Sequence, residues 1–244
     1  MSGTQFEYCK IIRSTGINVQ MIPGMITGGA AYILATLVAS GLLDFRFLLL
    51  LIPFIALIMI FELYRRQEKP FDSIAHTVFS IIYTALPFSL FPFSAFGREG
   101  INSIIPYEGN IFSPGIVIGF FILLWVNDTG AYITGITLGK HRLMERISPK
   151  KSWEGFAGGI VFSVLSACLL SGLLGVLDTR EWIIVALIVA VSGTFGDLIE
   201  SMLKRSTGIK DSGSIMPGHG GFMDRFDSTL LSFPLVFLFI VFFG

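Results

Sequence analysis

The sequence is poor in charged residues. Only 34 of its 244 residues, or 14%, are Lys, Arg, Asp or Glu, whereas about a quarter of the residues of a soluble domain are charged. Basic and acidic residues balance at 17 each, so the chain lacks the basic excess of a nucleic-acid-binding protein. Because 53% of the residues are hydrophobic, the composition excludes an ordinary soluble enzyme, a disordered chain and a nucleic-acid partner.

Cysteine is also scarce. The two cysteines, Cys9 and Cys168, are too few and too far apart for a disulfide framework, and the sequence indicates no role for either. Residues 1–20 lack the apolar core of a signal peptide. We therefore expect neither a disulfide-stabilised secreted domain nor a cleaved leader.

Long apolar runs are abundant. A run of about 20 residues crosses a hydrocarbon core of ~30 Å, and seven such runs lie at 21–43, 46–64, 72–93, 113–138, 155–177, 181–203 and 226–243. They predict an all-α fold, a polytopic integral membrane bundle of seven transmembrane helices. We divide it into residues 1–112, with three spans, and a catalytic region at 113–244 with loops 139–154 and 204–225.

Lysine and arginine gather on one side of the predicted bundle. Of the 17 basic residues, 14 fall on the side of the N-terminus and of loops 139–154 and 204–225, and Arg46, Arg98 and Arg180 fall on the other. Basic residues favour cytoplasmic loops. The distribution predicts a protein of the cell membrane with its N-terminus and both loops in the cytoplasm.

Two of the predicted spans contain an aspartate well inside their ends, which is costly in a bilayer unless it faces a cavity, a partner or a metal. At 1.5 Å per residue, Asp128 lies about 16 Å and Asp197 about 10 Å from the cytoplasmic ends of their helices. Asp197, Glu200 and Lys204 share one helical stripe. A Glu200–Lys204 ion pair is the structural alternative, but it leaves Asp197 without a partner on that helix.

The last cytoplasmic loop combines cationic residues, aspartates and glycines. Asp224 and Asp227 come at the start of the final helix, and the Pro217–Gly221 run would let backbone amides approach a ligand closely. No Walker motif is present. As an alternative to ligand binding, a favourable interaction with the helix dipole could explain one of the two aspartates. For His219, a structural role is the alternative to a catalytic one. The basic or titratable side chains here are Lys204, Arg205, Lys210, His219 and Arg225.

The other cytoplasmic loop carries a Ser148-Pro149 pair followed by Lys150 and Lys151. Ser-Pro predicts a helix start, and a helix N-terminus binds anions, so the two lysines suit a phosphate. An anchor on the positive-inside side of the membrane, with Trp153 at the interface, is the alternative.

Together these features describe carboxylates at hydrocarbon depth below a basic, glycine-rich cytoplasmic opening. Oxygen ligands without a Cys/His cluster favour Mg²⁺, and Mg²⁺ with basic side chains is typical of polyphosphate chemistry. We expect one water-soluble phosphate substrate and one lipid substrate.

The segment 201–227 reads S-x-L-K-R-x4-K-D-S-G-x-I-x-P-G-H-G-G-x-x-D-R-x-D and resembles the signature of the phosphatidate cytidylyltransferases (CDP-diacylglycerol synthases). Segments 127–132, 139–140, 147–155 and 196–201 are similar to internal motifs of that family. The resemblance implies an Mg²⁺-dependent nucleotidyltransferase of phospholipid biosynthesis, which joins CTP and phosphatidic acid to give CDP-diacylglycerol and pyrophosphate.

The resemblance also implies residue roles. Asp197 and Asp224 would hold the metal centre, with which a monovalent cation such as K⁺ is associated, and Asp128 is a further candidate ligand. We expect four catalytic residues, Asp197, Asp224, Lys204 and Arg225. The expected substrate-binding residues are Ser148, Lys150, Lys151, Arg205, Lys210, His219, Gly220 and Asp227.

Several alternatives stay open at this point. A CTP-dependent polyprenol or phytol kinase would release CDP instead of pyrophosphate, and an ion-coupled transporter would use Asp128 and Asp197 as ion sites. The oligomeric state is also open, and a homodimer is one alternative. Family members usually have two more helices before the first span found here, and Phe6-Glu7-Tyr8 resembles the end of one, so we expect that this chain starts late and lacks those helices.

Overall fold

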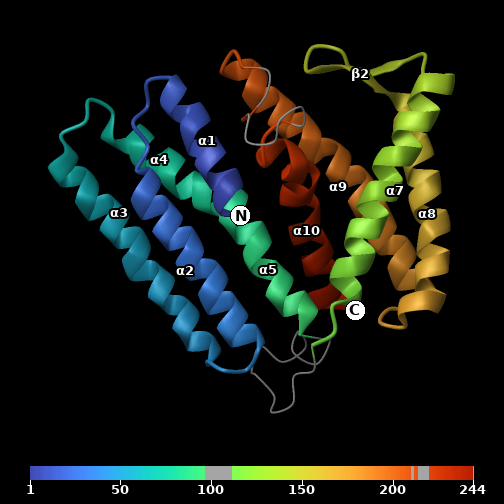
Figure 1. Cartoon of the computed structure of the whole chain (residues 1–244), viewed down its shortest axis with the longest axis horizontal. Helices are drawn as coiled ribbons and strands as arrows, with labels where there is room; N and C mark the ends of the chain where they lie inside the picture. Colours follow the sequence, from blue (N-terminus) through green and yellow to red (C-terminus); the bar gives the residue numbers. More distant parts are fainter. Residues whose placement is uncertain (97–111, 210–211, 214–219, 244) are drawn as a thin grey trace. The chain divides into compact units, whose positions relative to one another are not determined.

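The computed structural model describes residues 1–96, 112–209, 212–213 and 220–243 (Figure 1). Within these ranges, seven helical segments are long and apolar enough to cross a membrane. They are Met21–Ala39, Phe45–Arg65, Pro70–Ala95, Gly115–Leu138, Trp153–Leu174, Thr179–Ser206 and Met223–Phe243. The prediction of a seven-span, all-α membrane protein is confirmed.

Five of these spans are single helices and two are composite. The single ones are α2 (Met21–Ala39), α7 (Gly115–Leu138), α8 (Trp153–Leu174), α9 (Thr179–Ser206) and α10 (Met223–Phe243). A 3-10 turn, η1 (Phe45–Leu50), leads into α3 (Leu51–Arg65), and α4 (Pro70–Ser80), the π turn η2 (Ile81–Ala85) and α5 (Leu86–Ala95) form the other composite span. Pro87 follows η2 and has no N–H to donate, which explains an irregular helical turn there.

The chain forms two compact units. The first unit comprises residues 1–111 and 204–226, and the second comprises 112–203 and 227–244. Helices α9 and α10 each run from one unit into the other.

The first unit contains a helix outside the predicted spans, α1 (Ser2–Ser14). One face of α1 is buried, and Gln5 Nε2 donates to the Gly24 carbonyl at 2.9 Å and to Ser80 Oγ at 3.3 Å. The Tyr8 hydroxyl lies 3.0 Å from His76 Nδ1. The mixed polarity of residues 1–20 thus belongs to a helix packed on α2 and α4.

A buried carboxylate in the first unit accepts three hydrogen bonds on one oxygen. Glu62 on α3 is 3% exposed, and its Oε2 accepts from Gln20 Nε2 at 2.5 Å, Arg65 NH1 at 2.7 Å and Ser73 Oγ at 3.1 Å. Pairing with a cation and two neutral donors offsets the cost of burying the charge.

In the second unit, α7 and α8 pack closely because their contact face is made of small residues. A Cβ added to Gly155 would lie 2.8 Å from the Ala131 carbonyl oxygen, and one on Gly159 would lie 2.6 Å from Asn127 Oδ1. Small residues are typical of closely packed transmembrane helices. This crossing places Asn127 and Asp128 next to the start of α8.

Candidate active site

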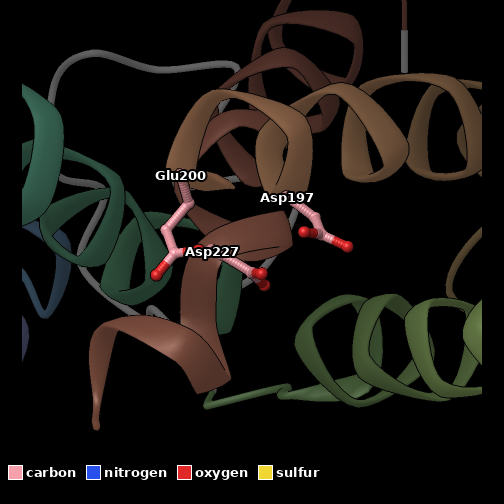
Figure 2. Close-up of side chains that lie close together, drawn as sticks. All are labelled: Asp197, Glu200 and Asp227. Carbon is pink, nitrogen blue, oxygen red and sulfur yellow. The ribbon is translucent and has the colours of Figure 1, made fainter. Parts of the chain in front are cut away.

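Three carboxylates gather in the second unit. Asp197 and Glu200 project from α9, and Asp227 comes from the first turns of α10 (Figure 2). One oxygen of each side chain lies within 4.8 Å of the oxygens of the other two. Glu200 is fully buried, and the other two are half-buried. Like charges repel at this distance, so the cluster is suited to a bound cation.

Gly196 brings α9 and α10 close enough to form the cluster. A Cβ on Gly196 would lie 2.7 Å from the Asp227 carbonyl oxygen and 3.0 Å from Ser228 Cα. Both are backbone atoms, which cannot move aside at low cost. The residue before Asp197 therefore has a packing role at the point where the acidic side chains meet.

Lys151 supplies positive charge to the same cluster. Its Nζ lies 2.5 Å from Asp197 Oδ2 and donates to the Thr194 carbonyl at 3.4 Å. The Ser201 hydroxyl donates to Asp197 Oδ1 at 3.2 Å. The sequence pattern paired Lys204 with Glu200 and gave Asp197 no cationic partner, and the fold provides one, Lys151, from strand β2.

A cavity of about 640 Å³ lies beside the cluster, within the second unit. Its polar lining comes from Asn127, Asp128, Arg142, Lys150, Lys151, Thr194 and Asp197. Its apolar lining includes Ile136, Leu143 and Phe156. A cavity of this size, lined by both polar groups and apolar side chains, has the usual character of a ligand site.

The segment that carries Ser148, Lys150 and Lys151 is a strand, not the helix start predicted from Ser148-Pro149. Strand β2 (Ser148–Ser152) pairs with β1 (Arg142–Met144) in an antiparallel hairpin. Helix α8 starts at Trp153, and its capping oxygen is Ser152 Oγ, which accepts from Gly155 N at 3.1 Å. The predicted helix start is wrong because these residues form backbone hydrogen bonds with β1 instead. Proline is tolerated in so short an edge strand.

Glu154 fixes the base of the hairpin. Its carboxylate accepts the backbone N–H groups of Lys140 and His141 at 3.1 to 3.3 Å, and His141 Nδ1 lies 2.6 Å from Oε1. The Trp153 N–H donates to the His141 carbonyl at 3.0 Å. The end of α7 is thus tied to the start of α8, so the hairpin holds Lys150 and Lys151 at the cavity.

The first unit holds the other predicted aspartate, Asp224. Its Oδ1 accepts from Lys204 Nζ at 2.8 Å. Its Oδ2 accepts from Gly221 N at 2.7 Å and from the backbone N–H and hydroxyl of Ser212 at 3.2 and 2.8 Å. Lys204 lies in the last turn of α9 and Asp224 in the first turn of α10. The predicted loop 204–225 therefore begins and ends with helical residues. A positive charge at the end of α9 and a negative charge at the start of α10 both interact favourably with the helix dipoles.

Five further predicted residues belong to the loop 204–225. Arg205 and Arg225 are exposed, and Gly220 has a φ of 77°, a left-handed value that favours glycine. Lys210 and His219 lie outside the described residues. The roles assigned to all of these residues stay predictions.

The sequence is similar to those of known proteins. A model of the cytidylyltransferase family matches residues 2–243. A protein named phosphatidate cytidylyltransferase from Staphylococcus haemolyticus is 33% identical over 244 residues, covering 90% of this chain and 94% of the relative. The chain belongs to the cytidylyltransferase family. The resemblance drawn from the motifs is thereby confirmed.

Other relatives of the cytidylyltransferase family align with only part of the chain. Proteins of the same name from Staphylococcus epidermidis and Staphylococcus aureus are 40% identical over 144 residues. That alignment covers 58% of this chain and 55% of each relative, so the chain spans about half the length of these curated relatives.

Two acidic residues that the structure places in or near these contacts were missing from the predicted site. For Glu200 the sequence offered only the structural alternative of an ion pair with Lys204, and the structure places its carboxylate with those of Asp197 and Asp227. Its spacing of three residues from Asp197 was the available signal. Glu7 accepts hydrogen bonds from Ser212, Phe222 and Met223, and no local pattern links residues more than 200 positions apart.

Proposed function

We propose that this chain is a phosphatidate cytidylyltransferase, which joins CTP and phosphatidic acid and releases pyrophosphate. The observation that carries the proposal is the acidic cluster beside a cavity lined with basic residues, in a chain of the cytidylyltransferase family. An integral membrane enzyme can take one substrate from the bilayer and the other from the cytoplasm.

Mg²⁺ suits the acidic cluster. The donors of Asp197, Glu200 and Asp227 are all carboxylate oxygens, gathered within 4.8 Å, and hard oxygen donors are the ones that Mg²⁺ prefers. When bound, Mg²⁺ would neutralise charge on phosphate oxygens. Asp224 belongs to the first unit, so its place among the ligands stays a prediction, as do the roles of Asp128 and of K⁺.

The basic lining of the cavity would hold phosphate groups. Arg142, Lys150 and Lys151 come from the hairpin and line the cavity together with Asp128 and Asp197. Arginine and lysine neutralise phosphate and position it by charge-assisted hydrogen bonds. Tyr132 and Ile136 on α7 also line the cavity and are 67% and 66% exposed, which would let acyl chains approach from the bilayer.

The reaction needs little acid–base help from the protein. The phosphate of phosphatidic acid is already an anion at neutral pH, and one of its oxygens would attack the α-phosphorus of CTP. The bond from that phosphorus to the bridging oxygen of the β-phosphate breaks, and pyrophosphate leaves. The task of the side chains is then to position the two phosphates and to neutralise their charge.

The test is incubation of the purified protein with CTP, phosphatidic acid and Mg²⁺, followed by assays for pyrophosphate and for nucleotide-linked lipid. We expect equal amounts of the two products. Release of CDP with phosphorylation of a lipid alcohol would indicate a kinase instead. Absence of any CTP-dependent lipid product, in protein that is folded and reconstituted with both substrates, would contradict the proposal.

A further inference from the structure

Glu7, on α1, contacts the beginning of α10 from within the first unit. Its side chain is 1% exposed. Oε1 accepts the Phe222 N–H at 3.0 Å, and Oε2 accepts the Met223 N–H at 2.8 Å. The first N–H groups of a helix have no partner inside the helix, and a carboxylate there is stabilised by the helix dipole.

The same carboxylate reaches Asp224 through Ser212. Ser212 Oγ lies 3.1 Å from Glu7 Oε2 and 2.8 Å from Asp224 Oδ2. The Ser212 hydroxyl has a single hydrogen to donate. Both carboxylates are within reach of this hydrogen, so Ser212 links Glu7 to Asp224. Asp224 is therefore oriented by a group that Glu7 also holds.

Two glycines leave room for this arrangement. A Cβ on Gly213 or on Gly221 would overlap the Glu7 carboxylate. Both glycines belong to the 201–227 segment that resembles the family signature, and at these two positions they leave room for a buried acid from α1.

We propose that Glu7 is a positioning residue, which holds the start of α10 and Ser212 in place and thereby fixes the orientation of Asp224. The part of this inference that concerns catalysis rests on the proposed function. This role needs only contacts within the first unit, to which Glu7, Ser212 and Asp224 all belong.

Gln5 offers a matched control on the same helix. It is as buried as Glu7, at 0% exposed, but its side chain donates to Gly24 and Ser80 on α2 and α4. Truncation of Gln5 would therefore disturb the packing of α1, but Ser212, Phe222 and Met223 would keep Glu7 as their acceptor.

The experiment compares Glu7→Gln, Glu7→Ala and Gln5→Ala in the purified full chain. Tryptic cleavage within residues 204–225 is followed by mass spectrometry, together with thermal unfolding, kcat, and KM for CTP. We expect Glu7→Ala to be cleaved at least about tenfold faster than Gln5→Ala and to lose at least about tenfold in kcat. Glu7→Gln, which keeps the size and one acceptor oxygen, should lie between wild type and Glu7→Ala in both measurements.

The outcomes separate the two proposals. If wild type forms no CDP-diacylglycerol, the proposed function fails, while the cleavage rates still test whether Glu7 holds the segment. If Glu7→Ala is cleaved and turns over like Gln5→Ala, the positioning role is wrong. If Glu7→Ala does not fold, Glu7→Gln decides, and wild-type cleavage and kcat in that variant would overturn the inference.

Discussion

The two units treat their buried acids in opposite ways. In the first unit, Glu62 is surrounded by an arginine, an amide and a hydroxyl that all donate to one oxygen. In the second unit, Asp197, Glu200 and Asp227 lie within reach of one another. A buried charge that is paired with a cation and neutral donors is compensated within the fold, whereas like charges gathered in one place cost stability unless a ligand compensates them.

This contrast predicts that the two kinds of site respond differently to mutation. Loss of an acid in the cluster should lower activity and leave the fold intact. Loss of Glu62 should lower stability and leave the chemistry intact. The four predictions below follow from this contrast, in order of decreasing expected effect.

Asp197→Asn should give the largest effect, a fall in turnover on the order of 10³-fold, since a metal ligand contributes several kcal/mol to charge stabilisation. Thermal unfolding in detergent should shift little, or to higher temperature, because a like-charge contact is removed. Turnover near the wild-type value at saturating Mg²⁺ would contradict the metal assignment.

Glu62→Ala should lower the free energy of unfolding by about 3 kcal/mol, because Arg65 and Gln20 lose their acceptor in a buried place. The kcat of the folded fraction should equal that of wild type. Asp44→Ala is the control, since Asp44 pairs with Arg46 in an exposed ion pair that contributes little. An equal melting temperature for both variants would remove the contrast between the two units.

Gly196→Ala should destabilise the protein by about 2 kcal/mol through overpacking and should also lower turnover, because α10 has to move away from α9. Gly172→Ala in α8 is the matched control, since a Cβ there meets nothing within 4 Å. Melting temperature and kcat measured on both variants would check this. A neutral Gly196→Ala would mean that the close approach of the helices is dispensable.

Lys151→Met should cost about tenfold in kcat/KM, because Lys151 both lines the cavity and pairs with Asp197. Lys150→Met should change mainly the KM for one phosphate substrate, since Lys150 lines the cavity without that pairing. Steady-state kinetics in both substrates would separate the two lysines, and identical profiles would count against a special role for Lys151.

Much of the architecture could be predicted because it depends on local properties. Apolar runs long enough to cross a bilayer identified all seven spans, and only their ends shifted by a few residues, as with α9, which continues to Ser206. Helix α1 was anticipated only at Phe6-Glu7-Tyr8, as the end of a helix that the resemblance implied. Its extent over Ser2–Ser14 was not predicted, because its buried face carries polar residues such as Gln5 and Glu7, whose partners are distant in sequence.

The candidate site was predictable in part. Asp197 was singled out because charge inside an apolar run is costly, and Asp227 because it stands with Asp224 at the start of the last helix. The motifs around them led to the correct family. The hairpin was not predicted, since Ser-Pro also fits a helix start. The pairing of Lys151 with Asp197 could not be predicted, since these residues are 46 positions apart on different elements.

Composition, hydropathy and short motifs were thus enough for the membrane class, the number of spans and the family, because each depends on residues near one another along the chain. Which acids meet, which lysine joins them and which buried glutamate supports Asp224 depended on how the helices cross. Those contacts are set by packing between distant segments, such as the approach of α9 to α10 at Gly196, and no local pattern encodes them.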